Sequence, residues 1–230
     1  MSSICYLQNL KEIDMIILVG STKGGAGKST AVTNIAAVLA HQEKEVLLFD
    51  ADRQPTSSEW ETERRLNHQE YPKITCIQRY GDIDSTIMEL SEKYANIVID
   101  VAGRDSDEFR SALTVADVVL VPIRPSQADL NAVHNTVRLI IQARRINPKI
   151  SAYGFLNQAP TNVKGKEIEL ARAFISDYPE LKMLSTNIYD RKVYRDALSE
   201  GFGVIEMVGK SDSENSARIE ILALVKEAGL

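Results

Sequence analysis

The chain has 230 residues, of which 44% are hydrophobic, and a formal net charge of −5 at neutral pH. This length suits one large α/β domain with a sizeable core, and no apolar stretch reaches the ~18 residues that a membrane-spanning helix needs. The start of the chain lacks the basic residues and long apolar run of a secretory signal, and the negative charge restricts any nucleic-acid site to a local patch.

Short apolar runs alternate with helical patterns along the chain. Strands are predicted at Met15–Gly20, Val46–Asp50, Ile74–Gln78, Ile97–Val101, Val118–Ile123, Ser151–Asn157 and Met183–Asn187. Helices are predicted over residues 28–41, over the segment in which Leu130, Val133, Val137 and Ile140 repeat with helical spacing, and from about Glu214 to Ala228. This alternation predicts an α/β fold, a doubly wound and mostly parallel sheet with helices on both faces.

One domain is predicted over residues 15–230, because no internal repeat, low-complexity tract or long linker divides the chain. Residues 1–14 are interpreted as a short N-terminal extension or an overlong gene start, and the alternative is a structured edge strand or cap. In either case we expect no helix-turn-helix domain ahead of the first loop. Cys5 and Cys76 show neither metal-ligand nor disulfide spacing, so we expect packing roles in a reducing cytosol.

The segment STKGGAGKST, residues 21–30, is similar to a phosphate-binding loop with one residue exchanged. Gly27, Lys28 and Ser29 fit the second half of the pattern G-x-x-x-x-G-K-[ST]. Thr22 takes the place of the first glycine, and Lys23 adds a second lysine. The segment lies between a predicted strand and a predicted helix, which is the context that the motif requires.

This loop predicts which residues hold a nucleotide. Its glycines allow a tight fold that aims backbone N–H groups at phosphate oxygens, and the helix N-terminus adds its positive end. Lys28 is expected to bind the β- and γ-phosphates, the Ser29 hydroxyl to ligate Mg²⁺, and Thr30 to bond the α-phosphate. The predicted nucleotide-binding residues of the loop are Gly24, Gly25, Ala26, Gly27, Lys28, Ser29 and Thr30.

Acidic residues end two of the predicted strands. Asp100 in ANIVIDVAG fits a Walker B aspartate that holds the metal through water, and Gly103 is expected to let the next loop approach the γ-phosphate. Asp50 and Asp52 stand two apart, so they project the same way at the sheet edge where ligands bind. We predict Asp50 and Asp100 for the metal shell and Asp52 for orienting the attacking water. The alternatives are a capping aspartate and a solvated acidic turn.

Together, KGGAGKST, DAD and IVIDVAG resemble the deviant Walker A family of P-loop ATPases, from about Met15 onward. That family includes ParA-type partition proteins, MinD, the nitrogenase iron protein and arsenite-pump ATPases. The resemblance implies ATP and Mg²⁺ as cofactors, ATP hydrolysis and an ATP-dependent homodimer. It also implies that Lys23 is the signature lysine, which reaches the partner subunit's phosphates once the dimer closes. The alternative for Lys23 is a solvated loop lysine.

Within this family the chain is most similar to short, ParF-like ParA proteins. In DADRQPTSSEW, residues 50–60, the aspartates and Trp60 fit their pattern, but Arg53 replaces the usual proline. FLNQAPT resembles the segment that supplies an adenine-reading asparagine, here Asn157, for which a strand-end turn former is the alternative. The resemblance implies a cytoplasmic protein that binds nucleoid DNA without sequence preference when ATP-bound, and a ParB-type partner that stimulates hydrolysis.

Basic residues gather in two segments that offer a DNA site. The predicted DNA-binding residues are Arg138, Arg144, Arg145, Lys149, Arg191, Lys192 and Arg195, and Lys164 and Lys166 extend the first segment. Such patches hold phosphates despite a negative net charge, and two weak patches add in a dimer. The alternative is a pair of solvated helix faces.

Two rival functions remain open. A MinD-like positioning or regulatory ATPase would control a membrane or protein partner, but SARIEILALVKEAGL at the end of the chain is predicted to be a core-covering helix, so we expect no membrane contact. A ligase resembling dethiobiotin synthetase would need a substrate pocket with several convergent polar groups.

Overall fold

The computed structural model describes residues 15–42, 44–161, 166–207, 209 and 211–230. Seven strands form one sheet in the order β3-β2-β4-β1-β5-β6-β7, and every neighbouring pair is parallel. The strands are β1 (Met15–Val19), β2 (Val46–Ala51), β3 (Thr75–Gln78), β4 (Asn96–Val101), β5 (Val118–Ile123), β6 (Ser151–Ala159) and β7 (Lys182–Tyr189). All seven predicted strands are therefore confirmed.

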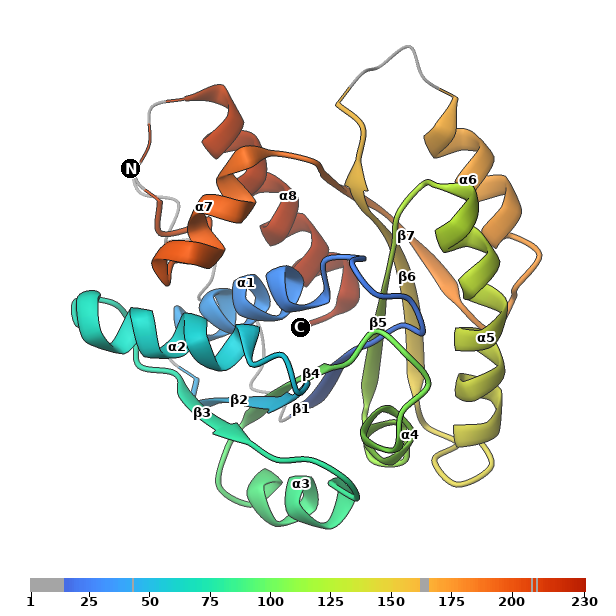
Figure 1. Ribbon diagram of the computed structural model, residues 1–230, viewed down its shortest axis with the longest axis horizontal. Coiled ribbons are helices and arrows are strands. Elements are labelled where there is room, and N and C mark those ends of the chain that lie inside the picture. The colour runs from blue at the N-terminus through green and yellow to red at the C-terminus, as the bar shows by residue number, and fades with distance from the viewer. Residues whose placement is uncertain (1–14, 43, 162–165, 208, 210) are drawn as a thin grey trace.

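Helices cover both faces of the sheet (Figure 1). They are α1 (Lys28–Ala40), α2 (Thr56–Asn67), α3 (Asp84–Ser91), α4 (Asp107–Leu113), α5 (Gln127–Ala143), α6 (Glu167–Ile175), α7 (Lys192–Glu200) and α8 (Asp212–Ala228). Helices α1, α2, α7 and α8 share one hydrophobic core with one face of the sheet, and α3 to α6 share a second core with the other. This arrangement confirms the doubly wound α/β prediction.

Local sequence signals explain where several helices begin and end. The Ser126 side chain caps α5, and at α8 Ser211 and Glu214 form a reciprocal capping box. Gly201 and Gly229 end α7 and α8 in the left-handed conformation, which costs glycine little. The boundaries of these helices are thus encoded within a few residues of each end.

Helices α2, α3, α4, α6 and α7 have no counterpart among the predicted helices. In α2 the buried residues are Ser57, Trp60 and Arg64, so the apolar repeat that reveals an amphipathic helix is almost missing. In the eight-residue α3 only Ile87 is buried, which leaves no periodic pattern at all. These helices depend on tertiary contacts that the local pattern does not report.

The parallel sheet brings the carboxyl ends of its strands to one edge. Val19 at the end of β1 and Asp50 near the end of β2 both lie opposite Asp100 of β4. The loops that follow these strands therefore meet, as expected for the ligand-binding edge of an open α/β sheet.

Two further sequence predictions concern single features. Cys76 is half-buried and packs against the core beside Ser58 of α2, so its packing role is confirmed, whereas Cys5 and the 1–14 extension lie outside the described residues. Within the described parts of the chain, no helix combines the length and hydropathy that crossing a membrane requires.

Candidate functional site

A pocket of about 290 Å³ opens at the carboxyl edge of the sheet, between the loop after β1 and the start of α2. It brings together predicted residues from three separate motifs, including Gly103, but Asp50 and Asp100 are not among the residues that line it. Among the residues that line it are Gly24, Gly25, Gly27, Lys28, Ser29, Thr30 and Asp52. Ala26 is buried behind the loop, and Lys23 is half-buried outside the pocket lining. The phosphate loop and the acidic switch segment thus share one site.

The loop leaves the N-terminus of α1 open toward the pocket. Gly25 and Gly27 have φ angles of 77° and 78°, a conformation that side chains with a Cβ rarely adopt. Gly27 is the N-cap of α1, and no side chain caps the helix there. The first N–H groups of α1 are therefore available to an anion, and the helix dipole favours one.

Lys28 supplies a buried cation at this helix end. Its side chain is only 7% exposed, and its Nζ atom donates a 3.3 Å hydrogen bond to the backbone oxygen of Lys23. Burial lowers the pKa of Lys28, and the negative charges of Asp100 and Asp52 offset that effect only in part. A phosphate group in the pocket would give this ammonium a directly bonded negative charge.

Asp100 is fully buried at the end of β4 and has one oxygen to spare. Its Oδ2 accepts a 2.6 Å hydrogen bond from the Ser57 hydroxyl, while Oδ1 has no hydrogen-bond partner among the described residues. Burial raises the pKa of Asp100 to about 6, although the nearby hydroxyls of Ser57 and Ser29 act in the opposite direction. An orphaned carboxylate oxygen beside Ser29 fits a magnesium ion or one of its water ligands.

Asp50 differs from Asp100 although the two lie opposite each other. Its Oδ2 accepts hydrogen bonds from the backbone and hydroxyl of Ser58, at 3.0 and 2.7 Å, and its Oδ1 accepts one from the backbone of Asp52 at 3.1 Å. Burial raises the pKa of Asp50. These contacts fasten the first turn of α2 to β2, so Asp50 has a positioning role besides any part in the predicted metal shell.

Asp52 is the residue for which the sequence predicts a water-orienting role. It is half-buried and lines the pocket, and its Oδ1 accepts a 3.0 Å hydrogen bond from the backbone of Gln54. Arg53, in place of the family's proline, points its guanidinium over the Tyr80 ring at 5.3 Å from the ring centre. The segment therefore keeps Asp52 on the pocket while Arg53 packs on the outer surface.

Gly103 lets the loop after β4 touch the phosphate loop directly. A Cβ atom at this position would lie 2.5 Å from the Cα of Gly24 and 2.7 Å from the backbone oxygen of Lys23. No other residue type fits there without moving the phosphate loop. The close approach expected at Gly103 is thus made to the loop itself, next to the place where a terminal phosphate would sit.

Asn157 and Gln158 reach the loop from the end of β6. The Asn157 side chain is buried and donates a 2.7 Å hydrogen bond to the backbone oxygen of Ala26, so it braces the phosphate loop. Gln158 lines the pocket and has a φ of 51°, which is strained for a residue other than glycine. Sequence reasoning singled out Asn157 but missed Gln158, whose strain only the backbone reveals.

The two predicted DNA-binding clusters lie in different parts of the fold. Arg191, Lys192 and Arg195 lie at the start of α7, at the carboxyl edge, and each pairs with a carboxylate. Their partners are Glu220, Asp196 and Asp190, at 2.7, 2.8 and 2.6 Å.

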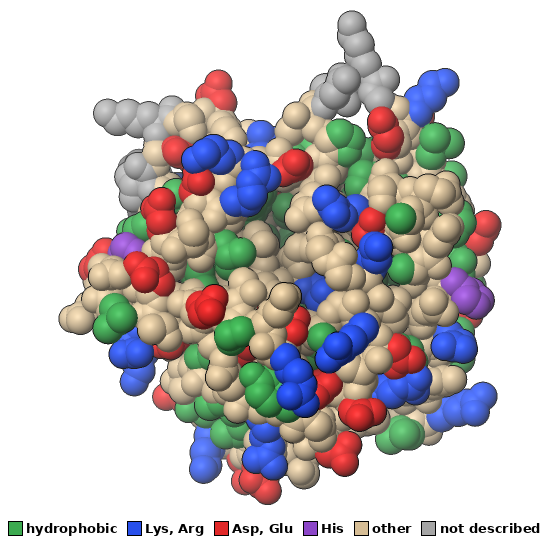
Figure 2. Space-filling model, in the orientation of Figure 1, with side chains coloured by type: hydrophobic (Ala, Val, Ile, Leu, Met, Phe, Trp, Pro, Cys, Tyr) green, Lys and Arg blue, Asp and Glu red, His purple; other side chains and the backbone are tan. Residues whose placement is uncertain are grey.

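The basic residues of the first cluster lie in α5 and in the turn after it. Arg138 lies within α5, and residues 144–149 lie in the turn that leads into β6, which is the amino edge of the sheet. Arg144 donates to the backbone oxygen of Glu180, while Arg138, Arg145 and Lys149 are exposed. On the face drawn in Figure 2, Lys and Arg side chains are interspersed with Asp and Glu. DNA binding by these two segments stays a prediction.

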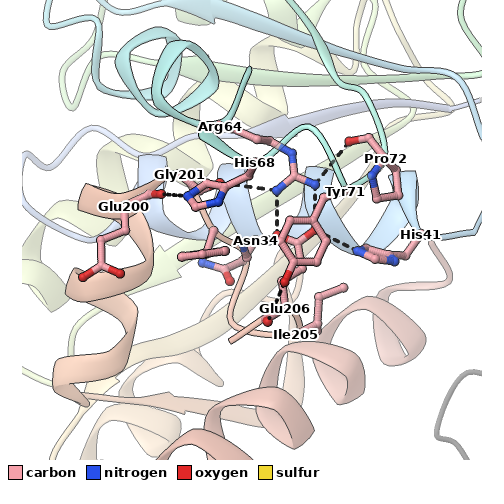
Figure 3. A network of polar contacts seen from close by, with 12 residues as sticks. Asn34, His41, Arg64, His68, Tyr71, Pro72, Glu200, Gly201, Ile205 and Glu206 are labelled. Carbon is pink, nitrogen blue, oxygen red and sulfur yellow. Dashed lines mark hydrogen bonds and ion pairs between the residues drawn. The ribbon is translucent and has the colours of Figure 1, made fainter. Parts of the chain in front are cut away.

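A buried polar network joins α2 to the loop between α7 and α8 (Figure 3). The Arg64 guanidinium forms two 2.6 Å hydrogen bonds to the carboxylate of Glu206, and His41 at the end of α1 lies 2.7 Å from the same carboxylate. One turn earlier, Trp60 donates to the backbone oxygen of Phe202 at 3.0 Å. Helix α2 is thus held at its first turn by Asp50 and Asp100 and at its far end by this network.

Comparisons with known proteins agree with this geometry. Residues 17–225 match the family described as CobQ/CobB/MinD/ParA nucleotide binding domain. The Maintenance of carboxysome distribution protein A of Halothiobacillus neapolitanus is 30% identical over 218 residues, which are 92% of this chain and 94% of that protein. Protein ParA of Rhizobium radiobacter is 31% identical over 130 residues, which are 55% of this chain and 56% of that protein.

Solved structures share the fold. The complex of Cyanothece McdA with ATP is similar with a TM-score of 0.75 at 17% identity, over 95% of this chain and 98% of that one. The septum site-determining protein MinD of Pyrococcus horikoshii, complexed with Mg-ADP, gives a TM-score of 0.69 at 18% identity, over 93% and 95% of the two chains. With the phosphate loop, the acidic segments and a match over residues 17–225, the chain belongs to the CobQ/CobB/MinD/ParA family of nucleotide-binding domains.

Proposed function

We propose that this protein is a Mg²⁺-dependent ATPase that uses ATP to switch between a monomer and a sandwich dimer. The dimer binds DNA without sequence preference and partitions plasmid or chromosomal DNA with a ParB-type partner. The observation that carries the proposal is the pocket at the carboxyl edge, where the uncapped N-terminus of α1 and the buried Lys28 meet Asp52. Asp100 lies buried at the end of β4 and keeps one oxygen without a hydrogen bond among the described residues.

The predicted site residues have separate tasks in this proposal. Lys28 and the loop N–H groups bind the triphosphate, and the Ser29 hydroxyl and Asp100 hold the magnesium ion, Asp100 through water. The ion, when bound, neutralises charge on the phosphates. Asp52 orients the attacking water. Asn157 keeps the loop in its binding shape and, in the bound state, reads the adenine.

Lys23 links the nucleotide to the dimer. Its side chain belongs to the loop but lies outside the lining of its own pocket. A cation placed in this way offsets phosphate charge of the partner's nucleotide only when the two subunits have closed. ATP therefore favours the dimer, and hydrolysis releases it.

A second candidate function differs from the first in the cargo that the protein moves. A relative that matches 92% of this chain is named for the maintenance of carboxysome distribution, whereas the relative named ParA matches 55%. That difference favours a protein body as an alternative cargo, moved by the same ATP-dependent dimer. A MinD-like switch at a membrane remains a further alternative for the same site.

The test is fluorescence anisotropy of a random-sequence DNA duplex, titrated with protein in Mg-ATP and again in Mg-ADP at two salt concentrations. We expect salt-sensitive binding in ATP alone, because phosphate contacts release counterions and the dimer doubles them. Absence of binding in both states, with hydrolysis intact, contradicts the DNA proposal. Co-sedimentation with anionic liposomes then tests the membrane alternative directly.

A further inference from the structure

Arg124 lies beside the phosphate loop although no motif includes it. It directly follows β5, and β5 pairs with β1, the strand that leads into the loop. A Cβ atom built on Gly25 would lie 3.8 Å from the Nη1 atom of Arg124. The residue is exposed, so its guanidinium stands at the tip of the loop and not beneath it.

Hydrogen bonds hold the loop and this segment together. Gly20 donates from its backbone to the Leu120 oxygen of β5 at 3.0 Å. Thr22, which replaces the first glycine of the common motif, donates its backbone N–H to the Thr136 hydroxyl at 3.0 Å and its own hydroxyl to the Ala132 oxygen at 3.1 Å. Threonine at position 22 thus fastens the loop to α5 by hydrogen bonds. The N-cap of α5 is Ser126, two residues after Arg124.

The charge of Arg124 is uncompensated. Within residues 15–42, 44–161, 166–207, 209 and 211–230, no carboxylate lies within ion-pair distance of its guanidinium, in contrast to the three cations at the start of α7. Arg124 is also not among the residues that line the pocket of its own chain. An exposed guanidinium at the tip of a phosphate loop therefore faces outward, as Lys23 is proposed to do.

We propose that Arg124 is a second cation that acts across the dimer and binds the phosphates of the nucleotide held by a second copy of this chain. The inference rests on the proposed ATP-dependent dimer and deepens it. In each pocket the buried cation Lys28 faces the carboxylates of Asp100 and Asp52. A planar guanidinium from the partner adds charge and two parallel hydrogen bonds where the phosphates are least compensated.

The first experiment compares Arg124→Ala and Arg124→Lys with the wild type. Arg124→Ala is expected to bind a fluorescent ATP analogue as a monomer within about twofold of the wild-type affinity, because its own pocket is intact. Its ATP-dependent dimerisation and its hydrolysis rate are expected to fall at least about tenfold, since a trans-acting arginine stabilises transferring phosphoryl groups strongly. Arg124→Lys keeps the positive charge but loses the planar guanidinium with its two parallel donors. It is therefore expected to retain part of the dimerisation and part of the hydrolysis rate. Arg65→Ala, an exposed arginine in the last turn of α2, is the matched control and is expected to leave all three quantities unchanged.

A mixing experiment decides between action across the dimer and action within one chain. Arg124→Ala lacks the trans cation but keeps Asp52, and Asp52→Ala lacks the water-orienting group but keeps Arg124. If Arg124 acts across the dimer, mixing the two inactive variants restores hydrolysis at the Arg124→Ala subunit. No restoration, with each variant still binding ATP, overturns the trans assignment.

The remaining outcomes separate this inference from the proposed function. Wild-type levels of dimerisation and hydrolysis in Arg124→Ala overturn the role of Arg124 and leave the ATP switch standing. A wild-type protein that binds ATP but stays monomeric overturns both.

Discussion

Lys28 and Asp100 are buried charged groups whose hydrogen-bonding capacity the described residues use only in part. The ammonium of Lys28 is buried against a backbone oxygen, and Oδ1 of Asp100 has no hydrogen bond among the described residues. Burying such groups unpaired costs free energy, so they are retained where a ligand completes them. In the proposed function, a nucleotide and its metal ion would supply the two kinds of partner that these residues need.

Lys28→Ala is expected to abolish measurable ATP binding. The substitution removes the buried cation that we propose binds the β- and γ-phosphates, and hydrogen bonds to charged groups are worth about 1.5–3 kcal/mol. The measurement is equilibrium binding of a fluorescent ATP analogue with Mg²⁺, and Lys44→Ala serves as a control outside the pocket. Normal affinity in Lys28→Ala contradicts the assignment of the loop.

Asp52→Ala is expected to dimerise with ATP but to hydrolyse it at least about a hundredfold more slowly. The carboxylate lines the pocket without bonding the loop, so its loss removes the water-orienting group and spares binding; general-base groups contribute about 10²–10⁴-fold. Single-turnover hydrolysis and analytical ultracentrifugation measure the two properties. Full turnover in the variant moves this role to another residue.

Helix α2 connects the pocket to a buried polar network by hydrogen bonds at its two ends. Its first turn bonds Asp50 and Asp100, and its last turn carries Arg64, which is 3% exposed, into the network with Glu206. Hydrogen bonds from His41 and Arg64 hold the pKa of Glu206 below its ordinary value despite burial, which acts to raise it. The helix is therefore stabilised at both ends by charges that lie far apart in the sequence.

Glu206→Gln is expected to lower the free energy of unfolding by about 3–5 kcal/mol at pH 7, because it leaves the buried guanidinium of Arg64 without its counter-charge. Denaturant unfolding measures the change. Glu200→Gln is the control, since Glu200 joins the network only through its backbone oxygen. A decrease below about 1 kcal/mol, as for an exposed pair, contradicts the importance of the network.

A second tie joins α8 to the edge strand β7. The Glu227 carboxylate accepts hydrogen bonds from the backbones of Ser185 and Thr186 and from the Thr186 hydroxyl, at 2.6, 2.9 and 2.7 Å. Burial acts to raise the pKa of Glu227, but these hydrogen bonds lower it to about 2 from an ordinary value of 4.5.

Because the folded-state pKa of Glu227 is depressed, its stabilisation is present above pH 4.5 and is lost as the pH falls toward 2. Glu227→Gln is expected to cost less than about 1 kcal/mol at pH 7, since water screens this exposed group. In denaturant titrations the difference from the wild type should shrink between pH 4.5 and pH 2. The same substitution at exposed Glu92 is the control and should show no such trend. A difference that stays constant over this range contradicts the role of the carboxylate.

At the scale of the whole molecule, the two basic clusters lie at opposite edges of the sheet. The α7 cations are neutralised by carboxylates, while Arg145 and Lys149 at the amino edge are exposed. A dimer that closes at the carboxyl edges places the amino edges of its subunits away from the nucleotide. If Arg145 and Lys149 bind DNA, ATP would therefore strengthen binding because the dimer carries two such patches. The nucleotide itself would not contact them.

The double variant Arg145→Ala/Lys149→Ala is expected to weaken DNA binding in Mg-ATP and to reduce the salt slope by about 2, roughly one for each cation that no longer binds a DNA phosphate. Lys192→Ala/Arg195→Ala is the matched comparison, with a smaller effect because Asp196 and Asp190 already neutralise these cations. Anisotropy of a random duplex over a salt series measures both. If Lys192→Ala/Arg195→Ala weakens DNA binding more than Arg145→Ala/Lys149→Ala does, the DNA surface lies at the carboxyl edge.

The sequence by itself determined the features that depend on neighbouring residues. The seven strands follow from short apolar runs, the phosphate loop from STKGGAGKST in its strand–helix context, and the family from KGGAGKST, DAD and IVIDVAG. Helix α2 escaped this reasoning, because its buried Ser57 and Arg64 are polar and gain their partners from β4 and from the loop before α8.

Only the tertiary structure decided which groups face one another. It separates Asp100, with a free oxygen among the described residues, from Asp50, whose oxygens are bonded. It also divides the cations of α5 and α7 between two edges of the sheet and brings Arg124 to the phosphate loop 99 residues away from Gly25. These facts depend on strand order and on long-range hydrogen bonds, and a local pattern of residue types records neither.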